Sequence, residues 1–307
     1  MKPTRAIPEL IGREAELRRV RACLEAGRNV LIEGPVGVGK THLALAVCHE
    51  LGVPVFRIDG DARYSEHKLS GWFDPPLVVK KGFSKEAFIP GPLVEAMKAG
   101  GVLFINELNR LPEGVQNILL PAVDERLVVV PRFGEVRAKP GFLVVATQNP
   151  KEFVATSHLS EAIMDRFELV VLDYQTSDDE REIVRANLAR QPGAKKVAAQ
   201  IKEKIIGHAV DLVRLTRGHP LVRRGGSVRA ALAVAELWVV LLQKAGAFEE
   251  SFFEAALLAL PNRIEFEPNA EAAENSKNEF EDFLREAIQK VLSGPMSAEP
   301  SNQKKKR

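Results

Sequence analysis

The residues with the clearest chemistry lie between Gly34 and Thr41. They fit the phosphate-binding pattern G-x-x-x-x-G-K-[ST], in which glycines let backbone N–H groups turn inward around a polyphosphate. The Lys40 ammonium can then reach the β- and γ-phosphates, and the Thr41 hydroxyl can hold Mg²⁺. The pattern predicts a nucleoside triphosphate site formed by Gly34, Pro35, Val36, Gly37, Val38, Gly39, Lys40 and Thr41.

The sequence around this loop supports the same interpretation. The apolar run 29–32 precedes it and is typical of a buried strand, while 41–48 has a helical pattern. The N-terminus of that helix would direct its positive dipole end at the phosphates. The alternative interpretation is an accidental glycine-rich turn. Such a turn would not need a strand before it and a helix after it, so this context favours the phosphate-binding loop.

A second polar segment, Asn106 and Glu107, follows the apolar run 102–105. ATP hydrolysis in a P-loop protein needs one group that positions Mg²⁺ and another that activates water. We expect Glu107 to be the general base, although a carboxylate can also end an ordinary strand. Asn106 stands where Asp is usual; its carbonyl oxygen can address Mg²⁺ but brings no charge. We therefore expect Asn106→Asp to lower the Mg²⁺ requirement, unless the added charge repels the γ-phosphate.

Three further polar residues are candidates for contacts with the nucleotide. Asn149 follows the run 142–147 and is expected to reach the γ-phosphate, although Asn149-Pro150 is also a turn signal. Arg166 lies near the end of the helical segment 159–167, where ring ATPases have an arginine that stabilises transition-state charge in the neighbouring subunit; a surface ion pair with Asp165 is the alternative. Arg229, in the first turn of a predicted helix, could fold over the phosphates from the lid. An arginine near a helix N-terminus is unfavourable for the helix dipole, and this local cost favours a functional reason for it.

The elements that must position these residues form an α/β pattern. Hydrophobic runs at 29–33, 53–58, 101–105, 142–147 and 169–172 alternate with helical segments, which predicts a parallel sheet covered on both faces. Two stretches interrupt it. Residues 73–90 are expected to form a short hairpin or loop, and 127–138 a second hairpin.

After about residue 175 the pattern is helical throughout. A capping box at 177–180 is expected to begin a helix, and further helices are expected at 197–215, 227–244 and 248–259. We predict domains at 1–174 (ATPase), 175–264 (all-helical lid) and 265–307 (acidic linker, amphipathic helix and basic tail). The apolar stripe of the segment 280–291 should dock on this chain's own lid or on a partner.

Composition excludes several classes of protein. The chain has 307 residues and a net charge of +2, which provides no strong field for nucleic acid. It has no run of eighteen apolar residues that would span a membrane. Cys23 and Cys48 lie in apolar helical patterns and are expected to pack. A cytoplasmic protein without a membrane span is the expectation.

Taken in order, the motifs resemble those of the MoxR-type AAA+ ATPases from about Pro8 to Ile264. The matching segments are Ile11-Gly12-Arg13-Glu14, the loop from Gly34 to Thr41, Phe88-Ile89-Pro90-Gly91-Pro92-Leu93, Asn106-Glu107-Leu108-Asn109-Arg110, Ala146-Thr147-Gln148-Asn149-Pro150, Asp165-Arg166-Phe167 and Gly226-Ser227-Val228-Arg229. Asn106 departs from the family's Asp and Val228 from its Pro, and the tail after 265 has no counterpart.

The resemblance implies a three-layer αβα P-loop sheet with a helix-2 insert at 73–90, a pre-sensor hairpin at 127–138 and a small helical lid. It implies Mg²⁺-dependent ATP hydrolysis, nucleotide contacts from Ile11 and Gly12, and a homo-oligomeric ring, usually a hexamer. Such proteins remodel or activate partners, often ones with a von Willebrand factor A domain.

Three functions follow as hypotheses. The first is ATP-driven remodelling of a partner protein. The second is a nucleotide-gated binding switch with slow hydrolysis, which the neutral Asn106 favours. The third is a DNA motor, against which the weak net charge and the lack of a recognisable DNA-binding domain argue.

Overall fold

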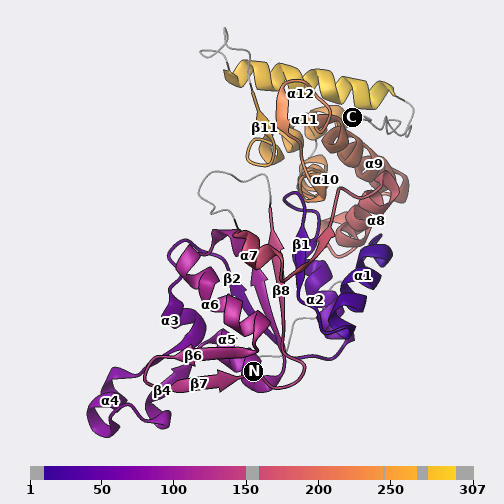
Figure 1. Ribbon diagram of the computed structural model, residues 1–307. Coiled ribbons are helices and arrows are strands. Elements are labelled where there is room, and N and C mark those ends of the chain that lie inside the picture. Colours follow the sequence, from indigo (N-terminus) through magenta and orange to yellow (C-terminus); the bar gives the residue numbers. More distant parts are fainter. Residues whose placement is uncertain (1–9, 150–158, 245, 268–275, 295–307) are drawn as a thin grey trace. The chain divides into compact units, whose positions relative to one another are not determined.

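The computed structural model describes residues 10–149, 159–244, 246–267 and 276–294. Pro150, the segment 268–275 and the basic tail lie outside this part of the chain. The chain divides into two compact units, Met1–Asp173 and Tyr174–Arg307 (Figure 1).

A parallel sheet lies at the centre of the first unit. Its described strands are β1 (Val30–Glu33), β2 (Val55–Asp59), β5 (Val102–Asn106), β8 (Leu143–Gln148) and β9 (Glu168–Val171), in the order β2-β5-β8-β1-β9. The central strands β1, β5 and β8 are almost wholly buried and rich in Val, Leu and Ile, as expected for a sheet covered on both faces. The predicted strands are confirmed, with ends shifted slightly.

Helices cover both faces of this sheet. Leu103 and Ile105 of β5 belong to a hydrophobic cluster with α5 (Pro92–Ala99) and α6 (Glu113–Asp124). Successive strand residues face opposite ways, so the alternate residues face α2 (Lys40–Glu50), which contacts β1, β5 and β8. Helix α1 (Glu14–Glu25) packs on α2 (Figure 1). The predicted three-layer arrangement is confirmed.

The two interruptions of the α/β pattern differ in outcome. Strands β6 (Leu127–Val130) and β7 (Gly134–Arg137) pair antiparallel, which confirms the second hairpin. Strands β3 (Gly71–Phe73) and β4 (Phe88–Pro90) also pair antiparallel, after helix α3 (Glu66–Ser70). Our prediction of a short hairpin or loop at 73–90 was wrong in one respect, however, because helix α4 (Pro75–Lys81) lies between these paired strands. The Asp74 side chain accepts a hydrogen bond from Leu77 N, and proline is tolerated in a first helical turn.

The second unit is built mainly of helices. They are α8 (Ser177–Leu188), α9 (Ala199–Thr216), α10 (Val228–Gln243), α11 (Phe248–Ala259) and α12 (Ser276–Ser293). Trp238 lies at the centre of their core, stacked on Phe252 with ring centroids 4.0 Å apart. Its indole N–H donates to the Phe248 carbonyl oxygen, so burial leaves no unpaired polar atom on the ring.

Three features of the second unit differ from expectation or extend it. β10 (Val222–Arg224), in the predicted all-helical lid, pairs antiparallel with β11 (Glu265–Phe266), in the predicted linker, so the second unit contains a short sheet. The first helix is capped by Thr176, whose hydroxyl accepts from Asp179 N, and not by Ser177. The apolar stripe of α12 is buried against α9 and α11 of its own unit.

Of the helices in the described part of the chain, none combines the length and apolarity needed to cross a membrane.

Candidate nucleotide site

The loop between β1 and α2 has the backbone conformation that its sequence pattern requires. Gly37 and Gly39 have φ of 81° and 94°, in the left-handed region that side chains disfavour. A Cβ on Gly34 would lie 2.3 Å from the Leu172 carbonyl oxygen, so only glycine fits there. Lys40 Nζ donates to the carbonyl oxygens of Gly34 and Pro35 at 2.6 and 2.7 Å. The ammonium therefore lies over the loop that would hold the phosphates.

A row of polar side chains crosses the carboxyl ends of neighbouring strands. Asn106 Oδ1, at the end of β5, accepts hydrogen bonds from Thr41 Oγ1 at 3.0 Å and from Thr147 Oγ1 at 3.1 Å. Asn106 Nδ2 donates to Asp59 Oδ1, at the end of β2, at 2.9 Å. Parallel strands end at one edge of the sheet, and here that edge meets the first turn of α2. The structure thus brings Thr41 and Asn106, the two predicted Mg²⁺ residues, together.

Glu107 follows Asn106 in a left-handed conformation, with φ 60° and ψ 57°. Its N–H donates to Thr147 Oγ1 at 3.0 Å. A Cβ on Gly60 would lie 2.1 Å from the Glu107 carbonyl oxygen, so the loop after β2 packs directly on this turn. The Glu107 carboxylate is 37% exposed and forms an ion pair with Arg110 at 3.1 Å. Non-glycine residues in this conformation concentrate at functional sites.

Asn149 and Arg166 lie in different surroundings. Asn149 is buried, and its backbone oxygen accepts from Asn109 Nδ2 at 3.4 Å. Arg166 follows helix α7 (Glu161–Met164) and is partly exposed. Its guanidinium donates to Asp124 Oδ2 at the end of α6 and to the Ala162 carbonyl oxygen, both at 2.6 Å. Arg166 thus forms an ion pair, as the alternative interpretation expected, but its main partner is Asp124. The Asp165 carboxylate lies farther away, at 3.8 Å.

The segment ahead of α1 is joined to the phosphate loop by a residue that sequence reasoning left without a role. Arg13 is buried and donates to the carbonyl oxygens of Val38, at 3.2 Å, and Asp173, at 2.5 Å. Ile11 and Gly12 directly precede Arg13 in the sequence. The contact of Arg13 with Val38 therefore ties their segment to the phosphate loop. Arg13 belongs to the motif carrying the family resemblance, which was the available signal. Arg229 is exposed in the first turn of α10, in the second unit.

Asp59 and Thr147 are two further site residues to which the sequence analysis gave no role, although Thr147 belongs to the resemblance segment 146–150. Thr147 is fully buried and hydrogen-bonds both Asn106 and Glu107. The hydrogen bond from Arg57 holds the pKa of Asp59 below its usual value, and the one from Asn106 lowers it further. Asp59 is therefore an anion at neutral pH. Both residues end hydrophobic runs, a signal too common to select them without the sheet register.

The oxygen atoms at this edge suit a hard divalent cation that is bound mainly through phosphate and water. Thr41 Oγ1 and Asn106 Oδ1 face each other at 3.0 Å, and oxygen ligands are those that Mg²⁺ takes. Within the described ranges no cluster of three or more His, Cys, Asp or Glu side chains could hold a metal by itself. These residues fit Mg²⁺ carried in with a nucleotide, since Mg²⁺ keeps several waters and substrate phosphates as ligands.

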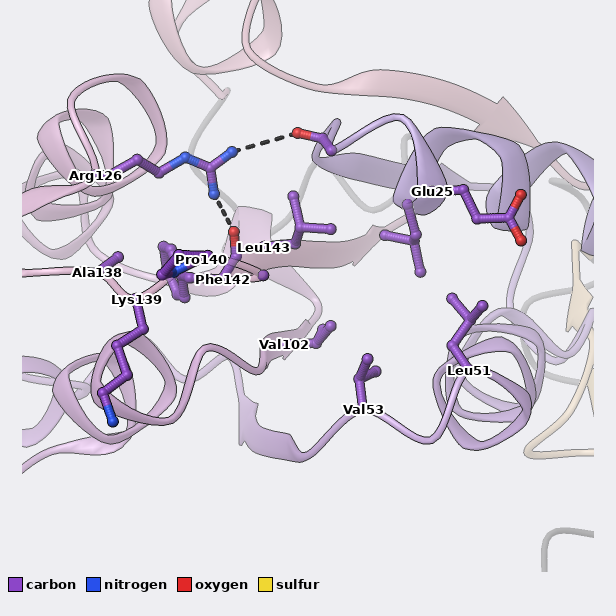
Figure 2. A pocket seen from close by; sticks show the side chains of 13 residues that line it. Glu25, Leu51, Val53, Val102, Arg126, Ala138, Lys139, Pro140, Phe142 and Leu143 are labelled. Carbon is purple, nitrogen blue, oxygen red and sulfur yellow. Dashed lines mark hydrogen bonds between the residues drawn. The ribbon is translucent and has the colours of Figure 1, made fainter.

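A cavity of about 560 Å³ lies at the opposite ends of the strands. Its walls include Val102 and Leu143, the first residues of β5 and β8 (Figure 2). Arg126 donates to the carbonyl oxygens of Gly27 and Phe142, drawn as dashed lines in Figure 2, and so joins two walls of the cavity. The phosphate loop lies at the carboxyl ends of the strands, so this cavity is not the nucleotide site.

Comparisons with known proteins agree with the geometry. Residues 29–167 match the family model for the AAA domain, dynein-related subfamily. An uncharacterized protein of Staphylococcus epidermidis is 29% identical over 223 residues, which cover 72% of this chain and 82% of the relative. An uncharacterized protein of Staphylococcus aureus has the same identity and coverage.

Solved structures share the fold. The RuvB Holliday junction branch migration motor of Thermotoga maritima has a TM-score of 0.53 at 20% identity, covering 81% of this chain and 70% of RuvB. NtrX of Brucella abortus, solved in complex with ATP, has a TM-score of 0.52 at 18% identity, covering 92% of this chain and 69% of NtrX. These likenesses confirm the predicted fold class of a parallel P-loop sheet with a helical C-terminal region.

Proposed function

We propose that this ATPase, whose residues 29–167 match the AAA domain, uses Mg²⁺-dependent ATP hydrolysis to remodel or activate a partner protein, as MoxR-type proteins do. The observation that carries the proposal is the contact between Thr41 Oγ1 and Asn106 Oδ1 at 3.0 Å. It joins the phosphate loop to the strand end that carries Glu107. A catalytic base next to the phosphate loop is the arrangement that hydrolysis requires.

Each candidate residue has a chemical role in this proposal. Lys40 binds the β- and γ-phosphates, and Thr41 and Asn106 face the cation. Mg²⁺, when bound, neutralises phosphate charge. Glu107 accepts a proton from the attacking water, and Asn149 orients that water. Ile11, Gly12 and Arg229 contact the nucleotide.

In this proposal a second positively charged group, the Arg166 guanidinium, reaches the nucleotide from a neighbouring copy of the chain. Arg166 is held by Asp124 and by the Ala162 carbonyl oxygen on its own chain, so its guanidinium is oriented before any second copy binds. An arginine that reaches the site of the next subunit stabilises transition-state charge there. We propose a homo-oligomeric ring, a hexamer by resemblance, in which each nucleotide site has residues from two copies.

Two other functions remain for experiment to separate. A nucleotide-gated switch with slow hydrolysis is favoured by the neutral Asn106, although Asp59 places a carboxylate 2.9 Å from its amide nitrogen. A DNA motor is suggested by the fold shared with RuvB, a Holliday junction branch migration motor. The net charge of +2 gives no support to that function.

The proposal is tested with the proteins encoded beside this chain's gene, beginning with any that contains a von Willebrand factor A domain. We expect that partner to raise the steady-state ATPase rate, and the Glu107→Gln variant to retain the partner in the presence of ATP. Lys40→Ala is the control that should do neither. If the partner changes nothing and duplex DNA raises the rate in a salt-dependent way, the remodelling function is wrong and the motor function is favoured.

A further inference from the structure

Asp59 and Asn106 form a pair at the carboxyl ends of two adjacent strands. They lie opposite each other in the parallel register of β2 and β5, and Asn106 Nδ2 donates to Asp59 Oδ1 at 2.9 Å. A carboxylate only accepts hydrogen bonds, so the amide nitrogen of Asn106 must be the atom that faces it. The other end of the amide, Oδ1, therefore faces Thr41 and Thr147.

The charges at this edge explain why residue 106 can be neutral. Glu107 is paired with Arg110, so its carboxylate has a cation of its own. Asp59 is also ion-paired, with Arg57, through two hydrogen bonds at 2.7 and 3.3 Å that keep it beside Asn106; its side chain is 60% exposed. An aspartate at position 106 would place a second carboxylate in contact with the first. Like charges in contact disfavour each other's ionised form, so the two adjacent positions 59 and 106 accommodate one anion between them.

We propose that Asp59 supplies the negative charge that Asn106 lacks. Together the two side chains replace one aspartate: Asn106 provides the oxygen that faces Thr41, and Asp59 provides the charge. Asp59 then attracts the hydrated Mg²⁺ of the bound nucleotide through that cation's water shell. The inference rests on the Mg²⁺–ATP site proposed above. It gives a positioning and charge-bearing role to a residue outside the motifs of the resemblance.

Equilibrium binding of a fluorescent ATP analogue, titrated with Mg²⁺, measures this role without turnover. Asp59→Asn keeps an oxygen that can accept from Asn106 and removes only the charge. We expect it to raise the Mg²⁺ concentration for half-maximal binding by at least about threefold, the effect of two opposite unit charges roughly 6 Å apart in bulk water; the double charge of Mg²⁺ would raise it to about tenfold. Asp61→Asn is the matched control, because it removes an exposed carboxylate of the same loop that is paired with Arg63.

The exchanged pair makes the test specific. Asn106→Asp alone should also raise the Mg²⁺ midpoint or lower the thermal unfolding temperature, because it puts two carboxylates in contact. The double variant Asp59→Asn/Asn106→Asp restores one carboxylate and one amide, and should return the midpoint to within about twofold of wild type, well inside the charge effect expected above. Circular dichroism of each variant confirms that it is folded before titration.

The outcomes separate the inference from the site on which it rests. If the wild-type protein binds the analogue in a Mg²⁺-dependent way but Asp59→Asn behaves as Asp61→Asn does, Asp59 does not address the cation and the inference is wrong. A double variant no better than either single variant would also overturn it. If the affinity of the wild-type protein for the analogue does not depend on Mg²⁺, or if Lys40→Ala binds the analogue as tightly as wild type, the proposed Mg²⁺–ATP site itself is wrong.

Discussion

Glu107 adopts a left-handed backbone conformation directly after Asn106 at the end of β5. Such a conformation costs about 1–3 kcal/mol for a residue with a side chain, and it persists where surrounding contacts fix it. Here the Thr147 hydroxyl accepts the Glu107 N–H, and Gly60 packs on the Glu107 carbonyl oxygen. At the scale of single residues, the candidate base is thus held in place by its backbone and by a buried neighbour.

Replacement of Glu107 by Gln should separate hydrolysis from binding. The amide has nearly the same shape but cannot accept the proton, so hydrolysis should slow by about 10²-fold or more. ATP affinity should stay near that of wild type. Phosphate release and equilibrium binding of a fluorescent ATP analogue measure the two properties. Glu113→Gln, an exposed site in the first turn of α6, is the control. A rate within a few-fold of wild type would place the base elsewhere.

Lys40→Ala removes the cation that we assign to the β- and γ-phosphates. Hydrogen bonds to charged groups contribute roughly 1.5–3 kcal/mol each, so the affinity for ATP should fall by about 10- to 100-fold or more. Fluorescence titration with an ATP analogue measures the change. The exposed Lys80 of α4 offers a control, Lys80→Ala, that removes the same charge from the surface. Unchanged affinity in Lys40→Ala would contradict the phosphate-loop assignment.

The contact between Asp59 and Asn106 reverses one expectation drawn from the sequence. With residue 106 considered alone, Asn106→Asp adds a useful charge and should lower the Mg²⁺ requirement. The structure shows a carboxylate already in contact with that side chain, 2.9 Å away. Asn106→Asp should therefore need more Mg²⁺ for ATP binding than the wild type, or unfold at a lower temperature, unless Asp59 is changed with it.

At the scale of elements, helix α12 packs into the core of the second unit. Leu284 is fully buried, Phe283 nearly so, and both contact the cluster formed by α9 and α11. The Phe283 ring lies 4.7 Å from the His219 ring, and the Arg285 guanidinium lies 4.1 Å from the Phe253 ring. The stripe predicted from the sequence thus has its docking surface on its own chain. The boundary that we placed at residue 265 remains a prediction.

Leu284→Ala should destabilise the second unit by about 2–5 kcal/mol, because it removes a fully buried side chain and leaves a cavity. Trp238 lies in the same core and reports on this unit; a Trp72→Phe background removes the signal of the exposed tryptophan in the first unit. Urea unfolding followed by fluorescence measures the change, with the exposed Gln289→Ala of the same helix as control. Equal midpoints for the two variants would show that α12 does not belong to the core.

The sheet and the phosphate loop could be predicted because their signals are local. Each core strand is a run of apolar residues bounded by turns, and the loop pattern specifies its own backbone. The pairing of β10 with β11 could not be predicted, because Val222–Arg224 and Glu265–Phe266 are short and far apart in the sequence. The cap of α8 was misplaced by one residue, because Thr176 and Ser177 are both good capping residues.

Part of the candidate site could also not be predicted, and for a different reason. Glu107 and Asn106 follow a strand next to each other in sequence, so their role is visible there. Asp59 joins them only because β2 and β5 are adjacent in a register that pairs Asp59 with Asn106. Sequence patterns give strands but not the order and register of a parallel sheet. A residue contributed by the neighbouring strand therefore stays invisible until the fold is known.

At the scale of the whole molecule, the proposal requires more than one copy of the chain. Arg166 has its main partner in Asp124, at the end of α6, on its own chain. Arg166→Ala should lower the ATPase rate by about 10³-fold or more, as loss of a transition-state arginine does in related chemistry. ATP affinity should change little. Steady-state rates and analogue binding on the same preparation measure both.

The ATPase rate of mixed subunits tests most directly the proposal that ATP is hydrolysed at sites shared between neighbouring subunits of a ring. Arg166→Ala and Glu107→Gln proteins should each be nearly inactive, but an adjacent pair in the right order contains one intact base and one intact arginine. In an equal, random mixture about one quarter of the sites are complete, so we predict recovery to about a quarter of the wild-type rate. If rings shown to contain both subunits recover no activity, Arg166 does not act in a neighbouring site and the shared-site account is contradicted.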